Sequence, residues 1–274
     1  MKRLGIIFHP KQEKAIVFSR KLEEYLNKQG ISTWLCSAWE PENARPLIAG
    51  TDMILSIGGD GTILRTARIV IPDSVPILGI NLGRLGFMTE LKASEAIDKL
   101  PRLLSGDGWI EERAILESKV SSQSEASYAL NDVFVGRRSS ARLVNIECKI
   151  NGVILTTYRA DGVIVATATG STGYSLAAGG PILHPQARDI ILKPVSSHFT
   201  LNKTLVLPPE TVIELKVSTS HEAMISNDGQ MESPLTSGAQ VSVKLSPYVA
   251  RFLRIRPKTY FYQSLEARLK RNIS

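Results

Sequence analysis

Cysteine is scarce in this sequence. Its 274 residues include only Cys36 and Cys148, which lie far apart and outside any Cys-x-x-Cys or Cys/His cluster. The histidines at positions 9, 184, 198 and 221 also lack the spacing of metal ligands. These absences exclude a disulfide framework and argue against a zinc site, and they make a reduced, cytoplasmic location the default expectation.

Long apolar runs are also missing. The N-terminus is basic, but the apolar stretch that follows covers only residues 4–8 before His9 and Pro10, which is too short for the core of a signal peptide. No segment approaches the roughly 20 apolar residues that span a bilayer. We therefore expect no association with a membrane.

Three common catalytic signatures are absent. There is no Gly-x-x-x-x-Gly-Lys-Ser/Thr run, so a Walker A nucleotide site is excluded. No Gly-x-Gly-x-x-Gly follows the first apolar stretch, residues 4–8, which disfavours a classical dehydrogenase. No serine lies in a Gly-x-Ser-x-Gly setting, which argues against hydrolase chemistry of that type.

The composition that remains is that of an ordinary globular protein with a positive charge. Apolar residues make up 43% of the chain and charged residues 22%, and the length is comfortable for two domains. The net charge of +7 suits anionic ligands such as nucleotides or polyphosphate, and it would also suit nucleic acid. A merely soluble basic surface is the alternative, and charge alone does not separate these interpretations.

The first third of the chain alternates apolar stretches with helical patterns. We predict strands at residues 4–8, 31–35, 52–57 and 76–80, and helices at residues 13–29, 62–70 and 93–104. Gly30 is a natural stop for the first helix, and Pro101 is expected to kink the last. Repeated strand–helix units imply a parallel sheet with right-handed crossovers. Residues 1–108 are therefore predicted to form a Rossmann-like α/β domain.

The pattern changes near residues 106–108 to short strands separated by turns. Asn151-Gly152 and Asp228-Gly229 each have the composition of a tight hairpin turn. The strands are predicted at residues 145–150, 153–158, 212–217, 241–245 and 252–256. We interpret residues 109–257 as a mostly-β, sandwich-like domain.

The chain closes with a predicted helix over residues 262–271, which carries Leu265 and Leu269 on one face among basic residues. Residues 258–274 are expected to pack back on the first domain. A helix lying on a membrane surface is the alternative, and the small apolar face disfavours it.

The sequence Gly58-Gly59-Asp60-Gly61-Thr62 follows a predicted strand and opens a helix. Its three glycines let backbone amides approach an anion, and the helix N-terminus adds positive partial charge. These glycines and Thr62 therefore form a candidate phosphate loop. A carboxylate such as Asp60 suits such a loop only where it binds a metal or accepts a proton from an attacking hydroxyl. The alternative is a tight turn in which Asp60 caps the helix.

Three further segments carry groups that suit a nucleotide. Residues 81–87, Asn-Leu-Gly-Arg-Leu-Gly-Phe, form a second glycine-rich loop whose Gly83 and Gly86 permit close packing against a ligand. Asn131 and Asp132 can bind adenine edges and ribose hydroxyls. Residues 159–181 contain an apolar strand and then a Gly-Ser-Thr-Gly turn that offers free amides, hydroxyls and an aromatic ring. The alternatives are an ordinary turn at 131–132 and a helix–sheet contact in which the small residues serve packing only.

In this order over about residues 56–181, the four motifs resemble the NAD kinase family. GGDGT alone is shared with diacylglycerol and sphingosine kinases and with phosphofructokinases, whereas N-x-G-x-L-G-F, the Asn-Asp pair and the long glycine-rich run are similar to the NAD kinase motifs. Ala177 and Ala178 depart from the pattern, because many members have serine there.

The resemblance implies transfer of a phosphoryl group from ATP or inorganic polyphosphate to the adenosine-ribose 2′-hydroxyl of NAD, which forms NADP. It implies an α/β and a β-rich domain with NAD between them, a divalent metal, normally Mg²⁺, and a homodimer or homotetramer. The metal ligands stay unassigned. Asp60 is expected to be catalytic. The NAD site is expected to include Asp60, Gly61, Arg65, Asn131, Asp132, Arg142, Arg159, Asp161, Thr172, Gly173, Tyr174, Ser175 and Gln230.

One relation among these residues, and the choice between rival functions, remain hypotheses at this point. If Asp161 faces the ligand, Arg159 shares that face of the strand, because side chains alternate along a strand. A lipid kinase and an NAD-binding regulator without catalysis are the rival functions. The Asn131-Asp132 pair disfavours the first, and Asp60 disfavours the second. We expect no nucleic-acid partner.

Overall fold

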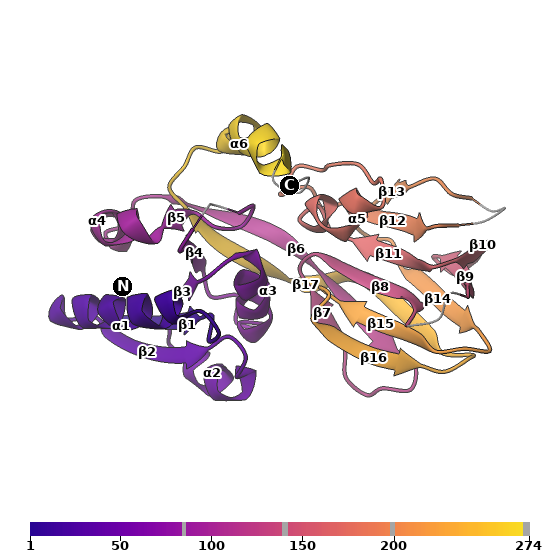
Figure 1. Cartoon of the computed structure of the whole chain (residues 1–274), viewed down its shortest axis with the longest axis horizontal. Helices are drawn as coiled ribbons and strands as arrows, with labels where there is room; N and C mark the ends of the chain where they lie inside the picture. Colours follow the sequence, from indigo (N-terminus) through magenta and orange to yellow (C-terminus); the bar gives the residue numbers. More distant parts are fainter. Residues whose placement is uncertain (84–85, 139–141, 198–200, 271–274) are drawn as a thin grey trace. The chain divides into compact units, whose positions relative to one another are not determined.

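The chain divides into two compact units in the computed structural model, which describes residues 1–83, 86–138, 142–197 and 201–270 (Figure 1). The first unit comprises Met1–Glu112 and the chain from Ala250 onward. The second comprises Arg113–Val249. Two long strands, β6 (Trp109–Val120) and β17 (Gln240–Arg254), have one end in each unit.

The first unit has a parallel sheet with the strand order β2-β1-β3-β4. The strands are β1 (Arg3–Phe8), β2 (Ser32–Ser37), β3 (Met53–Ile57) and β4 (Ile77–Asn81). A two-residue strand, β5 (Leu91–Lys92), pairs with β4, and so does the second half of β17 through Phe252 and Ile77. The predicted α/β domain with parallel strands is confirmed.

The helices of this unit are α1 (Glu13–Lys28), α2 (Pro41–Ile48), α3 (Asp60–Ile69), α4 (Ala93–Leu104) and α6 (Tyr260–Leu269). The chain moves from β1 to β2 in one direction and from β2 to β3 and β4 in the other. Right-handed crossovers therefore place α1 on one face of the sheet, and α2 and α3 on the opposite face. Buried residues of α1 and α4 pack in one cluster with alternate residues of β1, β3 and β4.

Local sequence explains where these helices begin and end. α1 buries Ala15, Leu22 and Leu26 at helical spacing, and Gly30, with φ 74°, follows its C-terminus. α3 begins two residues earlier than predicted, because the Gly59 carbonyl already accepts the Thr62 N–H at 2.9 Å. α4 continues through Pro101.

The last helix, α6, begins two residues before the predicted start, and residue 271 at the predicted end lies outside the described residues. Its buried side chains are Ser264 and Arg268 rather than a row of leucines. Among the described residues, no helix is both long and apolar enough to cross a membrane.

The second unit is a sandwich of two antiparallel layers, as predicted. One layer has the order β10-β9-β14-β17, and the other β13-β12-β11-β8-β15-β16. The strands are β8 (Asp132–Arg137), β9 (Val144–Ile150), β10 (Val153–Ala160), β11 (Gly162–Ala166), β12 (Ile190–Val195), β13 (Leu205–Leu207), β14 (Ile213–Ser218), β15 (Ala223–Asn227) and β16 (Met231–Leu235). A short strand, β7 (Ser127–Ala129), pairs with β6.

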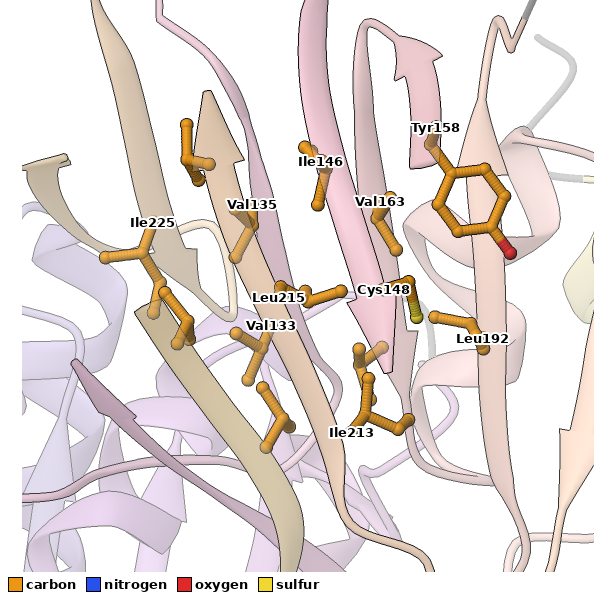
Figure 2. Packing of buried hydrophobic residues seen from close by; sticks show 14 of the residues in the cluster. Val133, Val135, Ile146, Cys148, Tyr158, Val163, Leu192, Ile213, Leu215 and Ile225 are labelled. Atoms are coloured by element: carbon orange, nitrogen blue, oxygen red, sulfur yellow. The ribbon is translucent and has the colours of Figure 1, made fainter. Parts of the chain in front are cut away.

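The core of this unit lies between the layers, where side chains from both layers meet (Figure 2). Val133, Val163 and Leu192 come from one layer, and Ile146 and Leu215 come from the other. A smaller cluster contains Phe134, Ile164, Ala166 and Ile191, the alternate residues of β8, β11 and β12, with Ala178 and Leu183 packed against it. It lies on the outer face of the second layer, where the glycine-rich run follows β11.

Both predicted hairpins are present. Asn151 and Gly152 have φ values of 50° and 82° between β9 and β10, and Asp228 and Gly229 have φ values of 55° and 62° between β15 and β16. Two positive φ values are typical of the turn that joins strands with right-handed twist. One strand prediction is wrong: residues 241–245 and 252–256 belong mainly to the single strand β17, which continues through Pro247 and ends at Arg254.

Candidate active site

The Gly-Gly-Asp-Gly-Thr loop joins β3 to α3. The strand order reverses between β1 and β3, and ligands of open α/β sheets commonly bind at the carboxyl ends of strands at such a point. Gly58 has φ 153°, and a Cβ added there would lie 2.3 Å from Thr62 Oγ1. Glycine is therefore required at position 58, whereas a Cβ at Gly59 would meet nothing within 4 Å.

The carboxylate of Asp60 accepts two backbone hydrogen bonds. The Phe87 N–H donates to Oδ2 at 2.8 Å and the Met88 N–H donates to Oδ1 at 3.1 Å. Gly86 packs directly on this carboxylate, since an added Cβ would lie 2.3 Å from Oδ1. The structure thus brings together two loops that the sequence predicted separately. Gly86 packs closely against Asp60, and close packing of this loop against a ligand stays a prediction. Residues 84–85 lie outside the described residues.

Arg65 lies one turn further along α3, in contact with an aromatic side chain. Its guanidinium carbon is 4.2 Å from the centre of the Trp39 ring, and Trp39 packs on His9 with the ring centres 4.6 Å apart. His9 follows β1 and Trp39 follows β2. The His9–Trp39–Arg65 cluster therefore lies at the carboxyl ends of the strands, as the phosphate loop does. A contact of Arg65 with NAD stays a prediction.

In the second unit, Asp228 holds the segment that contains Asn131 and Asp132. Its carboxylate accepts the N–H groups of Leu130, Asn131 and Asp132 at 3.1, 2.7 and 3.2 Å. Sequence reasoning identified Asp228 only as a hairpin residue, because nothing local indicates a contact with residues nearly 100 positions away. The hairpin turn and the Asn-Asp pair are parts of one structure.

The glycine-rich run that follows β11 packs on the same segment. It forms a 3₁₀ turn, η1 (Gly170–Thr172), and a single helical turn, α5 (Tyr174–Ala177). A Cβ added to Gly170 would lie 2.1 Å from the Asn131 carbonyl oxygen, so packing alone requires glycine there. A Cβ added to Gly173 would lie 3.6 Å from Asn131 Nδ2 and 3.7 Å from Asp132 Oδ2. The run therefore lies directly against both polar side chains.

Several buried polar atoms in this region have no hydrogen-bond partner within the part of the chain that the structure describes. They are Asn131 Oδ1, Thr169 Oγ1, Ser175 Oγ and Ser226 Oγ. Buried polar groups in folded proteins are nearly always paired. Such a concentration of unpaired atoms around residues 131–132 and 169–175 is typical of a surface that binds a polar ligand.

Asp132 and Tyr174 have perturbed acidities. Asp132 is 6% exposed, and burial, reinforced by the charge of Asp228, raises its pKa to about 7. Burial also raises the pKa of Tyr174, with contributions from Asp161 and Asp132. The Tyr174 ring packs edge-on against Phe134 at 5.7 Å and stays 44% exposed, so an aromatic surface remains available.

The raised pKa of Asp132 predicts a pH-dependent stability. Between about pH 4 and about pH 7, the folded state retains a proton that the unfolded state releases, so stability falls as pH rises through this window. The loss is at most about 4 kcal/mol. We expect Asp132→Asn to lose less unfolding free energy than wild type in urea titrations between about pH 4 and about pH 8. Equal losses in the two proteins would contradict the raised pKa.

Arg159 and Asp161 do not share a strand face, contrary to the hypothesis from alternation. β10 ends at Ala160, and the chain then passes to β11 in the other layer. Asp161 forms an ion pair with Arg137 at 2.7 Å. The exposed side chain of Arg159 lines a pocket of about 410 Å³. Its other lining residues are Arg142, Leu143, Asn145, Ser218, Thr219, Ser220 and His221. In it, Arg142 Nη1 lies 3.1 Å from His221 Nε2.

Gly61 lies in the first turn of α3, whereas Thr172, Ser175 and Gln230 lie in the glycine-rich run and beside the Asp228-Gly229 turn of the second unit. The Thr172 hydroxyl donates to the Thr169 carbonyl at 3.2 Å, and Ser175 is fully buried. Gln230 follows the Asp228-Gly229 turn, and its N–H donates to the Asn227 carbonyl at 3.1 Å. The described residues contain no group of three or more histidine, cysteine, aspartate or glutamate side chains arranged to hold a metal ion.

Known protein families match sequence from both units. The family models for the ATP-NAD kinase N-terminal and C-terminal domains match residues 30–108 and 130–255. This chain belongs to the NAD kinase family. It is accordingly a phosphotransferase whose reaction is the phosphorylation of NAD to NADP.

Relatives within the NAD kinase family match over nearly the whole chain. The NAD kinase of Dehalococcoides mccartyi strain BAV1 is 46% identical over 99% of this chain and 97% of its own length. That of Chloroflexus aurantiacus strain J-10-fl is 37% identical over 99% of this chain and 100% of its own.

Solved structures agree with this assignment. A crystal structure of an NAD kinase from Archaeoglobus fulgidus in complex with ATP is 27% identical, with a TM-score of 0.80 over 98% of both chains. Yeast NADH kinase complexed with NADH has a TM-score of 0.84 over 100% of this chain and 89% of its own, and at 24% identity it shows the fold.

Proposed function

We propose that Asp60 accepts the proton of the adenosine-ribose 2′-hydroxyl of NAD during phosphoryl transfer. The observation that supports this role most directly is the pair of N–H groups that fixes the carboxylate within a glycine-rich loop, at the first residue of α3. Each carboxylate oxygen has two lone pairs, so accepting one N–H leaves capacity for a substrate hydroxyl. Phosphoryl transfer depends mainly on positioning and on charge stabilisation, and a fixed carboxylate beside loop amides suits it.

The NAD-binding surface in this proposal is the Asn131-Asp132 segment with the adjoining glycine-rich turn. The unpaired Asn131 Oδ1, Thr169 Oγ1 and Ser175 Oγ supply hydrogen-bonding capacity, and Tyr174 supplies an exposed ring for a base. Gly61, Arg65, Asp161, Thr172, Gly173 and Gln230 complete the proposed contacts.

The proposed phosphoryl donor is ATP or inorganic polyphosphate, and ATP in the Archaeoglobus fulgidus complex supports the former. Gly58, Gly59, Gly61 and Thr62 would receive its phosphates, because free amides at a helix N-terminus bind anions. The test compares NADP formation with ATP and with polyphosphate, using an NADP-specific dehydrogenase as the coupling enzyme. Turnover with neither donor would contradict the assignment of the phosphate loop.

We propose that the reaction uses a divalent metal ion, Mg²⁺, which would be bound mainly by the phosphates of the donor. Mg²⁺ typically binds through one or two carboxylates and the substrate phosphates rather than in a protein cage. Because Asp60 is proposed to act as the proton acceptor, the ligands that this chain would supply to the ion stay unassigned. When bound, the ion neutralises charge on the transferred phosphoryl group.

We further propose a homodimer or homotetramer in the cytoplasm. β10 ends the strand order of its layer and carries the exposed side chains Val153, Ile154 and Leu155, at 71%, 60% and 36% exposure. Exposed apolar residues on an edge strand are commonly covered by association.

The proposed cytoplasmic location agrees with the two cysteines. Cys36 and Cys148 are buried free thiols, which suits a reducing compartment.

The Arg142–Arg159–His221 pocket is proposed to receive an anionic part of NAD bound to another copy. We expect Arg159→Ala to raise the KM for NAD and to flatten the dependence of KM on salt, because an exposed cation that contacts phosphate is screened by ions. Arg188→Ala in the same unit is the control. An unchanged salt dependence in Arg159→Ala would remove this pocket from the NAD site.

Association predicts complementation between two impaired variants, assayed at an NAD concentration below the KM of Arg159→Ala. A mixture of Asp60→Asn and Arg159→Ala chains, exchanged by dilution and reconcentration, should regain NADP formation, because mixed assemblies contain one complete site. Light scattering alongside the assay would give the assembly state. A mixture no more active than the sum of its separate parts would show that Arg159 acts within its own chain or not at all.

A further inference from the structure

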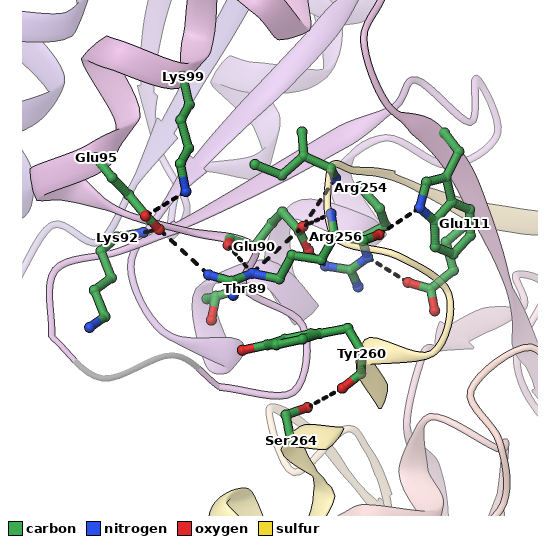
Figure 3. Close-up of polar contacts among 12 residues, drawn as sticks. Thr89, Glu90, Lys92, Glu95, Lys99, Glu111, Arg254, Arg256, Tyr260 and Ser264 are labelled. Atoms are coloured by element: carbon green, nitrogen blue, oxygen red, sulfur yellow. Dashed lines mark hydrogen bonds and ion pairs between the residues drawn. The ribbon is translucent and has the colours of Figure 1, made fainter. Parts of the chain in front are cut away.

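The first unit contains a buried ion network that sequence reasoning missed. Arg254, at the end of β17, is 6% exposed and lies between Glu90 and Glu111, which are 3% and 5% exposed (Figure 3). Arg254 Nε donates to Glu111 Oε2 at 2.5 Å, and its Nη1 lies 3.3 Å from Glu90 Oε2. Such a network requires every charge to be satisfied, because removal of one partner leaves an uncompensated buried charge.

The network holds the segment at residues 86–90 through hydrogen bonds to Met88 and from Glu90. Arg254 Nη1 donates to the Met88 carbonyl at 2.8 Å. Glu90 Oε1 accepts the N–H groups of Ile255 and Arg256 at 3.0 and 2.9 Å. The Glu90 N–H donates to the Gly79 carbonyl of β4 at 2.9 Å. The segment is therefore fastened both to β4 and to the end of β17.

The same segment also holds the Asp60 carboxylate, through the N–H groups of Phe87 and Met88. Met88 donates its N–H to Asp60 and accepts Arg254 at its carbonyl, so a single residue connects the buried cation with the proposed base. The Gly86 N–H donates to Thr89 Oγ1 at 2.7 Å, which closes the turn that presents the Phe87 and Met88 N–H groups. A displacement of residues 86–88 would move both donors of the Asp60 carboxylate.

We propose that Arg254 is a positioning residue for phosphoryl transfer: it fixes residues 86–88 so that their N–H groups orient the Asp60 carboxylate. This inference rests on the proposed role of Asp60. Arginine suits the position because its planar fork donates to Glu111, Glu90 and the Met88 carbonyl at once. Lysine keeps the charge, but it lacks this fixed arrangement of donors.

The test is a double-mutant cycle between Arg254→Lys and Asp60→Asn, with NADP formation as the readout. We expect Arg254→Lys to lower kcat by about 10- to 100-fold, since small misplacements of a reacting group cost rate on this scale, while the KM for NAD stays within about twofold. In the Asp60→Asn background, Arg254→Lys should change kcat by less than about twofold, because there is no base left to orient.

The matched control is Arg251→Lys, which lies on the same strand in an exposed ion pair with Glu112 at 3.0 Å and should leave kcat unchanged. If Arg254→Lys does not fold, the paired variant Arg254→Met with Glu111→Gln removes a buried cation together with a buried anion, and it should show the same loss of kcat. Folding is checked by circular dichroism and Tm.

The outcomes separate the two claims. Equal kcat losses from Arg254→Lys in both backgrounds would indicate a structural role and overturn the positioning role, while the assignment of Asp60 would stand. A wild-type kcat in a folded Arg254 variant would also overturn the positioning role of Arg254. A near-normal kcat in Asp60→Asn alone would remove the base assignment, and the positioning role would fall with it.

Discussion

Asp60→Asn should lower kcat by about 10²–10⁴-fold, the usual contribution of a general base. The substitution retains size and one acceptor oxygen, so one of the two N–H groups at Phe87 and Met88 keeps its partner. The amide nitrogen cannot accept a proton from the 2′-hydroxyl. We therefore expect the chemical step to be slowed by this factor while residues 58–62 keep their conformation.

Binding of NAD separates this role from a structural one. The Kd for NAD, measured by calorimetry, should stay within a few-fold of wild type, because the proposed binding groups lie mainly on the second unit. Asp107→Asn is the control, since Asp107 pairs with Arg102 at an exposed position with 53% of its side chain accessible. A near-normal kcat for Asp60→Asn would reduce Asp60 to a residue that joins two loops.

Asn131→Ala and Asp132→Ala should each weaken NAD binding by roughly 1–3 kcal/mol, the cost of leaving a ligand's hydrogen-bonding groups without partners. The backbone of the segment is held by Asp228 through three N–H groups, so neither truncation removes its support. The two variants therefore report on side-chain contacts with the ligand. We expect Kd to rise by about 5- to 150-fold in each.

The control for this pair is Glu232→Gln on β16, where the side chain is exposed and the strand belongs to the same layer. Its Kd for NAD should equal that of wild type. Asp228→Ala makes a useful contrast, because it should lower both affinity and Tm through the loss of backbone support. Wild-type affinity in both Asn131→Ala and Asp132→Ala would place the NAD site elsewhere.

Local sequence patterns predicted most of the strands of the first unit and both hairpin turns of the second. The apolar stretches of the first third became parallel strands, and both two-residue turns became hairpins, because φ preferences and burial periodicity operate over a few residues. The loop at residues 58–62 was recognised for the same reason: three glycines between a strand and a helix determine its shape.

Contacts between distant residues were beyond such reasoning. Asp228 lies 96 to 98 positions from the amides that it binds, and Arg254 lies 164 positions from Glu90. Neither residue carries a local feature that indicates its partner. Arg159 and Asp161 show the opposite error: two residues apart in sequence, they separate because the chain changes layers between them. Strand alternation applies only while the strand continues.

The most direct test of the account follows label from ATP carrying a radioactive γ-phosphate into product. The purified protein, NAD and Mg²⁺ should yield labelled product that an NADP-specific dehydrogenase accepts, and an NAD analogue without the adenosine-ribose 2′-hydroxyl should take up no label. Label in that analogue, or no labelled product from NAD itself, would contradict phosphorylation of NAD at the 2′-hydroxyl.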